Sequence, residues 1–455
     1  MSIIRSISGL RATLSDGSLS DNLITKYASA FHQFCPEGHI VIGRDGRPSG
    51  KKIEKLLFSA FQKLNRNVNI IGIVPSPTVQ FITETENAAG GISITASHNP
   101  DDWNGLKFIN AEGIFLDAEE NTKLWKIFDE LSDNEEFELS SLSEEEILAS
   151  NSNAFDSHIN SVLNLRYVSD IIDDIRKNNF KVVVDAVNAS GSKIVPKLLR
   201  EFGCNVIPLY CDESGIFPHL PEPLPVNLTA LASRVKDEHA DLGISVDPDA
   251  DRLVLIDENG NPIGEENTIV LSVWSVMSYL HGKSNPVAVV NHSSTQGVEY
   301  ITKKFGGSVA RSAVGEINVV KQMISLSAVI GGEGSGGVIL PECHYGRDSL
   351  VGISLILSLL TRTNKTLSQL RQAIPNYSMI KDKFHFEGDF AELRNKVKNI
   401  FSDCSIIEED GLKFIFPSSW VQIRKSNTEP IVRIIAEAIE RNEVEMLISK
   451  IKSEL

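Results

Sequence analysis

Short apolar runs alternate with amphipathic stretches from the start of the chain. Residues 40–43 form a continuous apolar run, and residues 68–74 are apolar except for Asn69; both are typical of strands. Between them, apolar positions in residues 51–58 recur at helical spacing, and Ser49 is expected to cap that helix. A strand, a helix and a second strand make a βαβ unit. The pattern therefore predicts an α/β domain in the first part of the chain.

Two further units of the same kind follow. The second has a strand at 181–185, a helix at 193–202 and a strand at 205–209. The third has a strand at 287–290 and a long helical stretch at 350–360. The recurrence predicts three similar mixed α/β domains built on βαβ units.

The last part of the chain has a different pattern. Strands are expected at 412–416 and 420–424, followed by a terminal helix that begins at Asn442 as its cap. This order is typical of an α+β domain. The predicted fold class is therefore α/β with a C-terminal α+β domain. The expected domains are 1–155, 156–257, 258–370 and 371–455.

Charge narrows the classes of partner. The 455 residues carry a formal net charge of −16 and contain no basic tract, so nucleic acid is not expected as a partner. Isolated arginines in or near turn-like segments instead suit a small anionic ligand such as a sugar phosphate. These arginines are Arg44, Arg47, Arg347, Arg424 and Arg433.

Cysteine usage and hydropathy indicate the compartment. Five cysteines are present, an odd number without a C-x-x-C pair, which favours a reducing cytosol over a disulfide framework or a zinc site. Residues 1–7 lack the apolar core of a signal peptide, and no apolar run approaches the length of a membrane span. We expect a cytoplasmic protein with no membrane partner.

The first chemical motif is a serine turn, residues 95–100, at the end of the apolar-polar alternation of residues 91–94. Ser97 lies at the turn, where its hydroxyl can attack or carry a phosphoryl group. Lys107 follows on the next short strand and can orient a phosphate or move a proton. Taken alone, such a serine also fits an ordinary surface turn, with Asn104-Gly105 as the turn of a hairpin.

The second motif is a run of alternating carboxylates, Asp247, Asp249 and Asp251, directly after an apolar strand and before Arg252. Three such groups repel one another without a cation, and oxygen-rich sites suit Mg²⁺. An EF-hand is the competing metal site, but Arg252 stands where its loop needs glycine and a strand pattern follows. A solvated acidic turn remains the alternative without a metal.

The third and fourth motifs supply polar groups for a ligand. Residues 331–337 contain five glycines around Glu333 and Ser335, a pair that fits the vicinal hydroxyls of a hexose. Residues 424–430, with Arg433 nearby, can form a cradle for a phosphate dianion. The alternatives are a flexible glycine linker for the third motif and a polar turn for the fourth.

In chain order, the four motifs resemble those of the α-D-phosphohexomutase superfamily, which includes phosphoglucomutases, phosphomannomutases and phosphoglucosamine mutases. Residues 95–100 match the family's T-A-S-H-N-P turn, and residues 247–252 match its D-x-D-x-D-R metal loop. Residues 332–336 match its G-E-x-S-G sugar loop, and residues 424–430 match its phosphate loop. The resemblance covers the whole chain and implies four domains around a central active-site cleft.

The resemblance also implies a mechanism. Ser97 carries a phosphoryl group to a hexose monophosphate, forming a hexose 1,6-bisphosphate that acts as intermediate and activator. The other phosphate of this intermediate then returns to Ser97. Mg²⁺ is held by Asp247, Asp249, Asp251 and an oxygen of phosphorylated Ser97.

The remaining implied roles surround that step. Lys107 is the first choice for proton transfer, and the partner is a small sugar phosphate bound by a monomer or homodimer. The implied catalytic group also contains Arg11, His98 and Arg252. The implied substrate-binding group is Gly315, Glu333, Ser335, Arg424, Ser426, Asn427, Thr428 and Arg433.

The chain departs from common family patterns in ways that bear on its sugar. Gly337 stands where many members have histidine, and His344 is expected to substitute for it in proton transfer. Glu316 occupies a position that varies with substrate in the family, and a carboxylate there favours an amino sugar. The third and fourth motifs look most like those of archaeal-type phosphoglucosamine mutases.

Phosphoglucosamine mutase is therefore the first interpretation, and a phosphoglucomutase/phosphomannomutase of broad specificity is the second. A metal-dependent serine phosphohydrolase would use Ser97 and the same carboxylates but admit water. A non-catalytic sugar-phosphate-binding paralogue is a third class, and the intact Ser97 and Lys107 argue against it.

Overall fold

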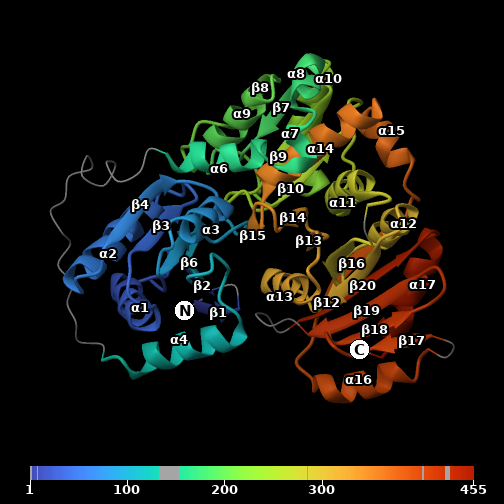
Figure 1. Cartoon of the computed structure of the whole chain (residues 1–455). Helices are drawn as coiled ribbons and strands as arrows, with labels where there is room; N and C mark the ends of the chain where they lie inside the picture. The colour runs from blue at the N-terminus through green and yellow to red at the C-terminus, as the bar shows by residue number, and fades with distance from the viewer. Residues whose placement is uncertain are drawn as a thin grey trace.

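The computed structural model describes residues 3–7, 9–132, 153–283, 285–401, 404–425 and 431–454. The chain forms four consecutive units, each built on one sheet, that follow one another in an arc (Figure 1). The first unit, in blue, lies opposite the last, in red, and the second and third connect them.

The first unit is a six-stranded mixed sheet in the order β1-β2-β6-β5-β3-β4. Strands β3 and β5 are apolar along nearly their whole length because helices cover both faces of the sheet. A capping box of Asp117 and Glu120 starts α4. The elements are β1 (Ile3–Ser6), β2 (Gly9–Thr13), α1 (Asp21–Phe34), β3 (Ile40–Arg44), α2 (Gly50–Lys63), β4 (Val68–Ile73), α3 (Ser76–Thr85), β5 (Gly90–Ile94), β6 (Trp103–Ile109) and α4 (Ala118–Glu130).

The second unit is a four-stranded sheet in the order β10-β9-β7-β8. Strand β7 pairs in parallel with β8 and β9, and β10 runs antiparallel to β9. The elements are α6 (Ala154–Leu163), α7 (Arg166–Ser169), α8 (Ile172–Asn178), β7 (Lys181–Asp185), α9 (Gly191–Glu201), β8 (Asn205–Leu209), η1 (Pro225–Asn227), α10 (Thr229–Asp237), β9 (Leu242–Val246) and β10 (Leu253–Ile256).

The third unit is a five-stranded sheet in the order β12-β11-β13-β14-β15. The glycine-rich motif forms the turn between two of its strands, so it is not a linker. The elements are α11 (Glu266–Leu280), β11 (Val287–Asn291), α12 (Gly297–Lys304), β12 (Ser308–Ser312), α13 (Glu316–Leu326), β13 (Ile330–Glu333), β14 (Gly337–Leu340), β15 (His344–Arg347), α14 (Ser349–Thr363) and α15 (Leu367–Gln372).

The first three units share one topology. In each, a central strand pairs in parallel with the next two strands of a βαβαβ segment, and the third of these pairs antiparallel with the following strand. This confirms the prediction of three similar mixed α/β units. The second and third units also share one hydrophobic core, to which α14 and α11 contribute heavily.

The C-terminal unit is an antiparallel sheet in the order β16-β20-β19-β18-β17, covered by two helices. It has its own core and confirms the predicted α+β unit. The elements are β16 (Ser378–His385), α16 (Phe390–Lys398), β17 (Ser405–Ile407), β18 (Leu412–Ile415), β19 (Trp420–Lys425), β20 (Ile431–Ala438) and α17 (Arg441–Lys452).

Two local predictions, the caps at Ser49 and Asn442, were wrong, and the alternative of a hairpin turn at Asn104-Gly105 is excluded. Ser49 has helical dihedrals and no capping bond, because its hydroxyl instead accepts a hydrogen bond from Asn104 at 2.8 Å. Asn104-Gly105 is no hairpin turn, since both residues lie inside β6. Asn442 lies within the first turn of α17, and Glu440 occupies the cap position.

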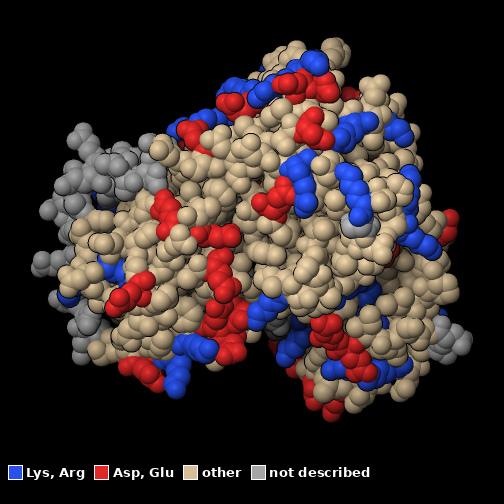
Figure 2. Space-filling view, in the orientation of Figure 1, with Lys and Arg blue, Asp and Glu red and all other residues tan. Residues whose placement is uncertain are grey.

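The surface is mixed in charge. On the face shown in Figure 2, the described Lys and Arg residues are interspersed with Asp and Glu and form no single basic surface. Within the described part of the chain, no helix combines the length and the apolar character needed to cross a membrane.

Candidate active site

The shared topology brings three of the four motifs to equivalent positions. Ser97 lies in the loop between β5 and β6, the carboxylates at 247–251 lie between β9 and β10, and Ser335 lies between β13 and β14. Each loop therefore follows the third strand of its βαβαβ segment. Arg424, from the fourth motif, lies near the end of β19.

These loops meet at a central cleft. A cavity of about 540 Å³ is lined by residues of all four units, among them Arg11, Arg252, Ser335, Arg424 and Arg433. A cavity of about 240 Å³ shares several of its walls. The smaller cavity is lined by Ile7, Arg11, Ser97, His98, Lys107, Phe115, Arg252, Val314, Gly315, Glu316, Ile317, Glu333 and Arg347.

Ser97 is held in a strained, buried turn. Its φ of 51° is in the left-handed region, which a residue with a Cβ adopts at a cost, and only 1% of its surface is exposed. The Ser97 hydroxyl donates to Asp247 Oδ2 at 3.2 Å, and His98 Nδ1 lies 3.3 Å from Ser97 Oγ. The backbone N–H of Ser97 donates to Thr95 Oγ1 at 2.8 Å.

A buried ion pair maintains the turn. Arg47 and Asp45 are fully buried and joined at 2.9 Å. One guanidinium nitrogen of Arg47 donates to the carbonyls of Ser97 at 2.6 Å and Asn99 at 2.7 Å. Asp45 also accepts from the Thr95 hydroxyl at 2.6 Å. The prediction that Arg47 is available to an anion was wrong, because the serine turn already uses its donors.

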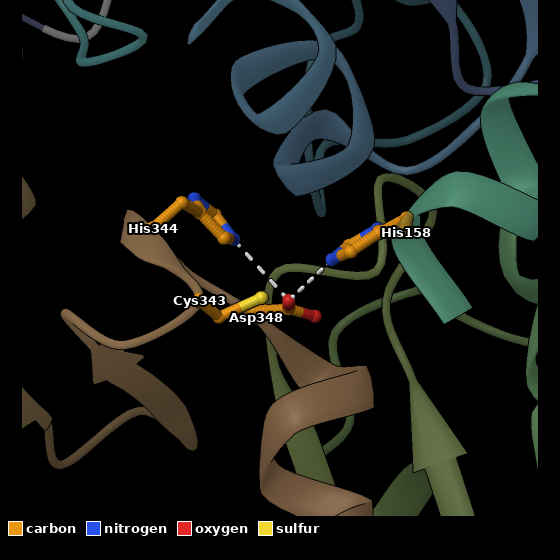
Figure 3. Close-up of side chains that lie close together, drawn as sticks. All are labelled: His158, Cys343, His344 and Asp348. Atoms are coloured by element: carbon orange, nitrogen blue, oxygen red, sulfur yellow. Dashed lines mark hydrogen bonds and ion pairs between the residues drawn. The ribbon is translucent and has the colours of Figure 1, made fainter. Parts of the chain in front are cut away.

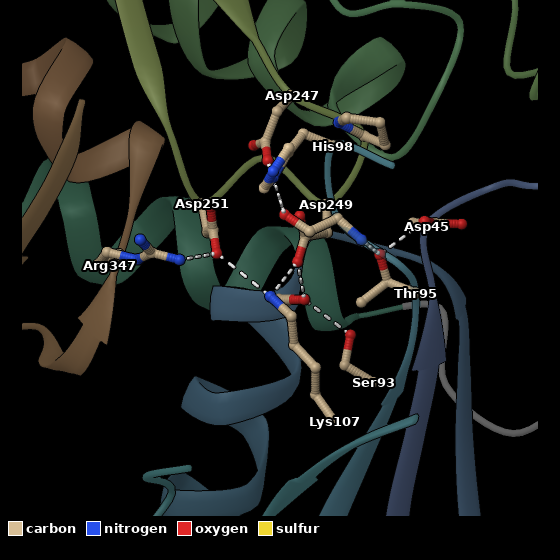
Figure 4. A network of polar contacts seen from close by, with 12 residues as sticks. Asp45, Ser93, Thr95, His98, Lys107, Asp247, Asp249, Asp251 and Arg347 are labelled. Atoms are coloured by element: carbon tan, nitrogen blue, oxygen red, sulfur yellow. Dashed lines mark hydrogen bonds and ion pairs between the residues drawn. The ribbon is translucent and has the colours of Figure 1, made fainter. Parts of the chain in front are cut away.

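The three carboxylates of the acidic motif converge around Lys107 (Figure 4). One oxygen from each of Asp247, Asp249 and Asp251 lies within 4.8 Å of the others, and all three side chains are buried. Lys107 Nζ donates to Asp249 at 2.5 Å and to Asp251 at 3.2 Å. Within the described part of the chain, one oxygen each of Asp249 and Asp251 is buried without a hydrogen-bond partner. Such oxygens are free to bind a cation.

The carboxyl groups of Asp247 and Asp251 have pKa values shifted in opposite directions. Burial, followed by repulsion from Asp251 and Asp249, raises the pKa of Asp247 well above its usual range. Burial alone would also raise the pKa of Asp251, but the Arg347 guanidinium and Lys107 hold it below its usual range. Burial opposes the charge of Lys107, yet Asp249 and Asp251 raise its pKa. Lys107 therefore keeps its proton.

His98 has the opposite character. The Arg252 guanidinium, burial and Arg11 lower the pKa of His98 well below its usual value. Its imidazole is therefore neutral at physiological pH. A neutral Nδ1 near the Ser97 hydroxyl is able to accept a hydrogen bond or a proton.

Neighbouring elements hold the carboxylate loop in position. The hydroxyl of Ser76, at the start of α3, donates to Asp249 at 2.7 Å, and the hydroxyl of Ser190 donates to the Pro248 carbonyl at 2.7 Å. Ser349, at the start of α14, donates to the carbonyl of Ala250 at 2.7 Å. Because β10 begins directly after this loop, an EF-hand is excluded.

Arg347 is a central residue that motif reasoning did not assign to the site. It donates to Asp251 at 2.6 Å, to Glu333 at 2.7 Å and to Glu316 at 3.0 Å. It thus connects the carboxylate loop of the second unit to the glycine-rich motif, residues 331–337, of the third. Its guanidinium is fully committed to carboxylates, so the prediction of an anion-binding arginine was wrong here also. Arg44 pairs with Glu54 at 3.3 Å and is not among the residues that line either cavity.

Glu333 is ordered by several donors. Besides Arg347, its carboxylate accepts from Asn291 at 2.8 Å and from the N–H of Gly315 at 3.1 Å. Gly315 has a φ of 122°, a conformation that favours glycine. Glu333 and Ser335 both line the larger cavity, as the spacing of the sugar motif predicted.

Two arginines that line the larger cavity are partners across neighbouring strands. Arg424 on β19 is the direct cross-strand partner of Arg433 on β20. Like charges opposite one another destabilise a sheet unless an anion compensates them. The Arg424 Nε is buried without a partner among the described residues. Ser426, Asn427 and Thr428 lie outside the described residues.

His344 does not take the place of the missing histidine. Among the described residues that line the two cavities, His344 is absent, and it lies instead beside Asp348 at 3.2 Å. The sequence offered no signal for this, because β15 carries Arg347 toward the cleft and His344 into the interior.

Comparisons with known proteins agree with this architecture. The phosphoglucomutase/phosphomannomutase family models match the chain as α/β/α domain I over residues 3–135, domain II over 156–260, domain III over 266–377 and the C-terminal domain over 380–453.

Individual relatives cover nearly the whole chain. The "phosphoglucomutase/phosphomannomutase" of Thermococcus kodakarensis is 35% identical, with 88% of this chain and 86% of the relative covered. The "phosphoglucosamine/phosphogalactosamine mutase" of Sulfurisphaera tokodaii is 30% identical, with 95% of each covered. A family protein from Burkholderia thailandensis has the same fold, with a TM-score of 0.82 at 22% identity over 99% of this chain and 98% of its own. The chain therefore belongs to the phosphoglucomutase/phosphomannomutase family.

Proposed function

We propose that this protein interconverts hexose 1-phosphate and hexose 6-phosphate through a phosphorylated Ser97, with glucosamine phosphate as its preferred substrate. The observation that carries this is that the Ser97 hydroxyl lies against Asp247 in the smaller cavity, while Arg424 and its cross-strand partner Arg433 line the larger cavity that shares its walls. Such a cleft has a site for the phosphoryl group in transfer and a second site for the phosphate at rest.

In the transfer step, the bond between phosphorus and Ser97 Oγ breaks while a bond to the free sugar hydroxyl forms. Ser97 Oγ gains a proton, and the sugar hydroxyl loses one. Lys107 lines the same small cavity as Ser97, holds a proton and is our choice for this transfer: it donates its proton to Ser97 Oγ and takes up the proton that the sugar hydroxyl loses. His98, Arg11 and Arg252 surround the reacting oxygens. After the hexose 1,6-bisphosphate turns over in the cleft, its other phosphate returns to Ser97.

The carboxylate loop fits Mg²⁺. Its donors are hard oxygens, and two of them are buried with no hydrogen-bond partner among the described residues, so the loop suits a small divalent cation. Asp247, Asp249, Asp251 and an oxygen of phosphorylated Ser97 would hold the ion. Bound there, it would neutralise the charge that develops on the phosphoryl oxygens.

The sugar and the resting phosphate are assigned to the other two motifs. Glu333 and Ser335 would bind the 3- and 4-hydroxyls, which exchange roles when the sugar turns over. Arg424 and Arg433 would hold the phosphate that is not in transfer, and we extend this role to Ser426, Asn427 and Thr428 by their place in the motif. Gly315 would approach the sugar through its backbone.

Two carboxylates support the amino-sugar preference. Glu316 and Glu333 line the small cavity, and each has an oxygen on Arg347. An ammonium group at the sugar's C2 would find negative charge there, whereas a neutral hydroxyl would gain less. The relative from S. tokodaii carries an amino-sugar mutase name, and the one from T. kodakarensis carries the alternative, phosphoglucomutase/phosphomannomutase.

The proposed roles correspond to four domains. These are a phosphoserine domain (1–155), a metal-binding domain (156–257), a sugar-binding domain (258–370) and a phosphate-binding domain (371–455). We propose a cytoplasmic monomer or homodimer that binds sugar phosphates and neither nucleic acid nor membranes.

A side-by-side assay tests the function. The protein is given glucosamine, glucose, mannose and N-acetylglucosamine 1-phosphates with Mg²⁺ and the matching 1,6-bisphosphate, and 6-phosphate formation is measured. The proposal expects the highest kcat/KM for glucosamine 1-phosphate. Equal values for glucose and mannose phosphates would favour broad specificity instead. Release of inorganic phosphate without isomerisation would indicate the phosphohydrolase, and no turnover of any sugar would indicate a binding paralogue.

A further inference from the structure

A second cluster of metal-binding side chains lies away from the cleft (Figure 3). It contains His158, Cys343, His344 and Asp348, and one ligand atom of each lies within 4.8 Å of the other three. None of the four lines either cavity of the active site. The mechanism proposed above uses none of them.

The cluster is assembled from segments far apart in the chain. His158 comes from α6, whereas the other three residues come from β15 and the two segments that flank it. His158, His344 and Asp348 are at most 1% exposed, and both histidines direct Nε2 at the same oxygen of Asp348, at 2.8 and 3.2 Å. The sulfur of Cys343 faces the same point.

We propose that these four side chains form a structural zinc site with His₂CysAsp ligation. Two imidazoles, a thiolate and a carboxylate are the donor types that zinc prefers, and four protein ligands complete a closed tetrahedral site. Zinc bonds of about 2.0–2.3 Å place such ligand atoms about 3.3–3.8 Å apart. The observed spacing is close to these values, so shifts of about 1 Å in the four side chains would bring their ligand atoms to a tetrahedral zinc geometry.

The surroundings support metal ligation over a simple hydrogen-bonded cluster. The hydroxyl of Thr78, on α3, lies 2.9 Å from Nδ1 of His158, so it can accept that proton and leave Nε2 as the ligand. Ser161 Oγ lies 3.6 Å from Cys343 Sγ and can donate to a thiolate. Nδ1 of His344 is buried without a partner among the described residues.

The position of the site gives it a structural role. Its ligands come from the second and third units, and Thr78 comes from the first, so a metal there would fix the junction of three units. Asp348 also caps α14 by accepting from the N–H of Leu350 at 2.8 Å. Because Arg347 directly precedes Asp348, the zinc site would hold the segment that carries Arg347 into the active site.

Metal content of the tag-free protein tests the site. The protein is loaded with Zn²⁺, freed of loose metal in buffer with excess Mg²⁺, and its zinc is counted by mass spectrometry. We expect one zinc per chain in the wild type and in the control Cys211→Ser, whose cysteine is also partly exposed and lies outside the cluster. Cys343→Ser and His344→Ala should retain less than a tenth as much.

Two results would overturn the site: a wild-type protein that retains no zinc, or cluster variants that retain as much as the wild type. If the variants do not fold, the cobalt-substituted wild type decides the question. An intense tetrahedral spectrum with a thiolate-to-cobalt charge-transfer band would support the site, and a weak octahedral spectrum would contradict it. Both measurements are independent of mutase activity, so they remain valid if the proposed function fails.

Discussion

Arg347 donates to Asp251 at 2.6 Å and thereby joins the third unit to the carboxylate loop of the second. The same guanidinium holds Glu333 at 2.7 Å, so one side chain sets the distance between the proposed metal loop and the proposed sugar site. Arginine suits this position because its planar fork can serve several carboxylates in fixed directions.

Arg347→Met should therefore misplace both loops. We expect kcat/KM for glucosamine 1-phosphate to fall about 100-fold, since small displacements of reacting groups cost that much. Arg347→Lys keeps the positive charge but loses the planar fork of donors, so its kcat/KM should lie between those of the wild type and Arg347→Met. Steady-state kinetics of the three proteins provide the measurement. A kcat/KM of Arg347→Met within twofold of the wild type would show that Arg347 does not position the two loops for catalysis.

Arg47 offers a test of the serine turn. Arg47→Met leaves Asp45 buried without its partner and frees the carbonyls of Ser97 and Asn99. Breaking a buried pair costs about 3–5 kcal/mol, so the free energy of unfolding by urea should fall by that amount. Arg176→Met, at a largely exposed position, serves as the control and should leave stability unchanged. Equal stabilities of the two variants would show that the buried Arg47–Asp45 pair does not stabilise the serine turn.

Arg424 tests the second phosphate site. Arg424→Ala should raise KM about 10- to 150-fold, because each lost charge-assisted contact is worth about 1.5–3 kcal/mol. Among the described residues, the exposed Arg441 pairs only with Glu445 in the same helix, and Arg441→Ala is the matched control. An unchanged KM in Arg424→Ala would place the resting phosphate elsewhere.

The buried position of Lys413 should make the stability of the protein depend on pH. Lys413 is 3% exposed, lies 3.8 Å from the centre of the Trp420 ring and donates to the carbonyl of His292. Burial, followed by the Arg311 guanidinium, lowers the pKa of Lys413 to about 6. The ordinary pKa of lysine in the unfolded chain is about 10.4. The unfolded state therefore binds the extra proton between these values, and stability rises with pH across that range.

Lys413→Met removes this proton uptake. The difference in unfolding free energy, wild type minus variant, should become more favourable to the wild type as the pH rises from 6 to 10. Urea unfolding at several pH values measures this difference. A difference that is constant with pH would show that the pKa of Lys413 is not lowered in the folded protein.

The sequence was sufficient to predict central strands of the first three units and the loops that follow them. Largely apolar segments such as residues 90–94 and 242–246, each with a single serine, are buried along their whole length, as expected of central strands. The motifs at the ends of these strands could be assigned to a shared site because the three units repeat one topology. The loop at 247–251 is the clearest case, since its residue types alone indicated a cation.

What the sequence could not predict depends on long-range contacts. Arg347 and Arg47 look like anion-binding residues in a turn, and only the folded chain shows that carboxylates occupy them. Ser49 looks like a helix cap, but Asn104 engages its hydroxyl across the sheet. His344 was expected in the cleft as a substitute for the histidine that Gly337 replaces. This expectation was wrong because no local pattern shows toward which side a residue of a short buried strand turns.

The central claim is that Ser97 carries the phosphoryl group during turnover. The protein is incubated with ³²P-labelled glucose 1,6-bisphosphate, digested and mapped by mass spectrometry, and a second sample is chased with unlabelled glucose 1-phosphate. The account predicts label on Ser97 that the chase transfers to sugar, with no label and no mutase activity in Ser97→Ala, and normal labelling in the surface control Ser169→Ala. Mutase turnover in Ser97→Ala, or label that the chase cannot remove, would contradict it.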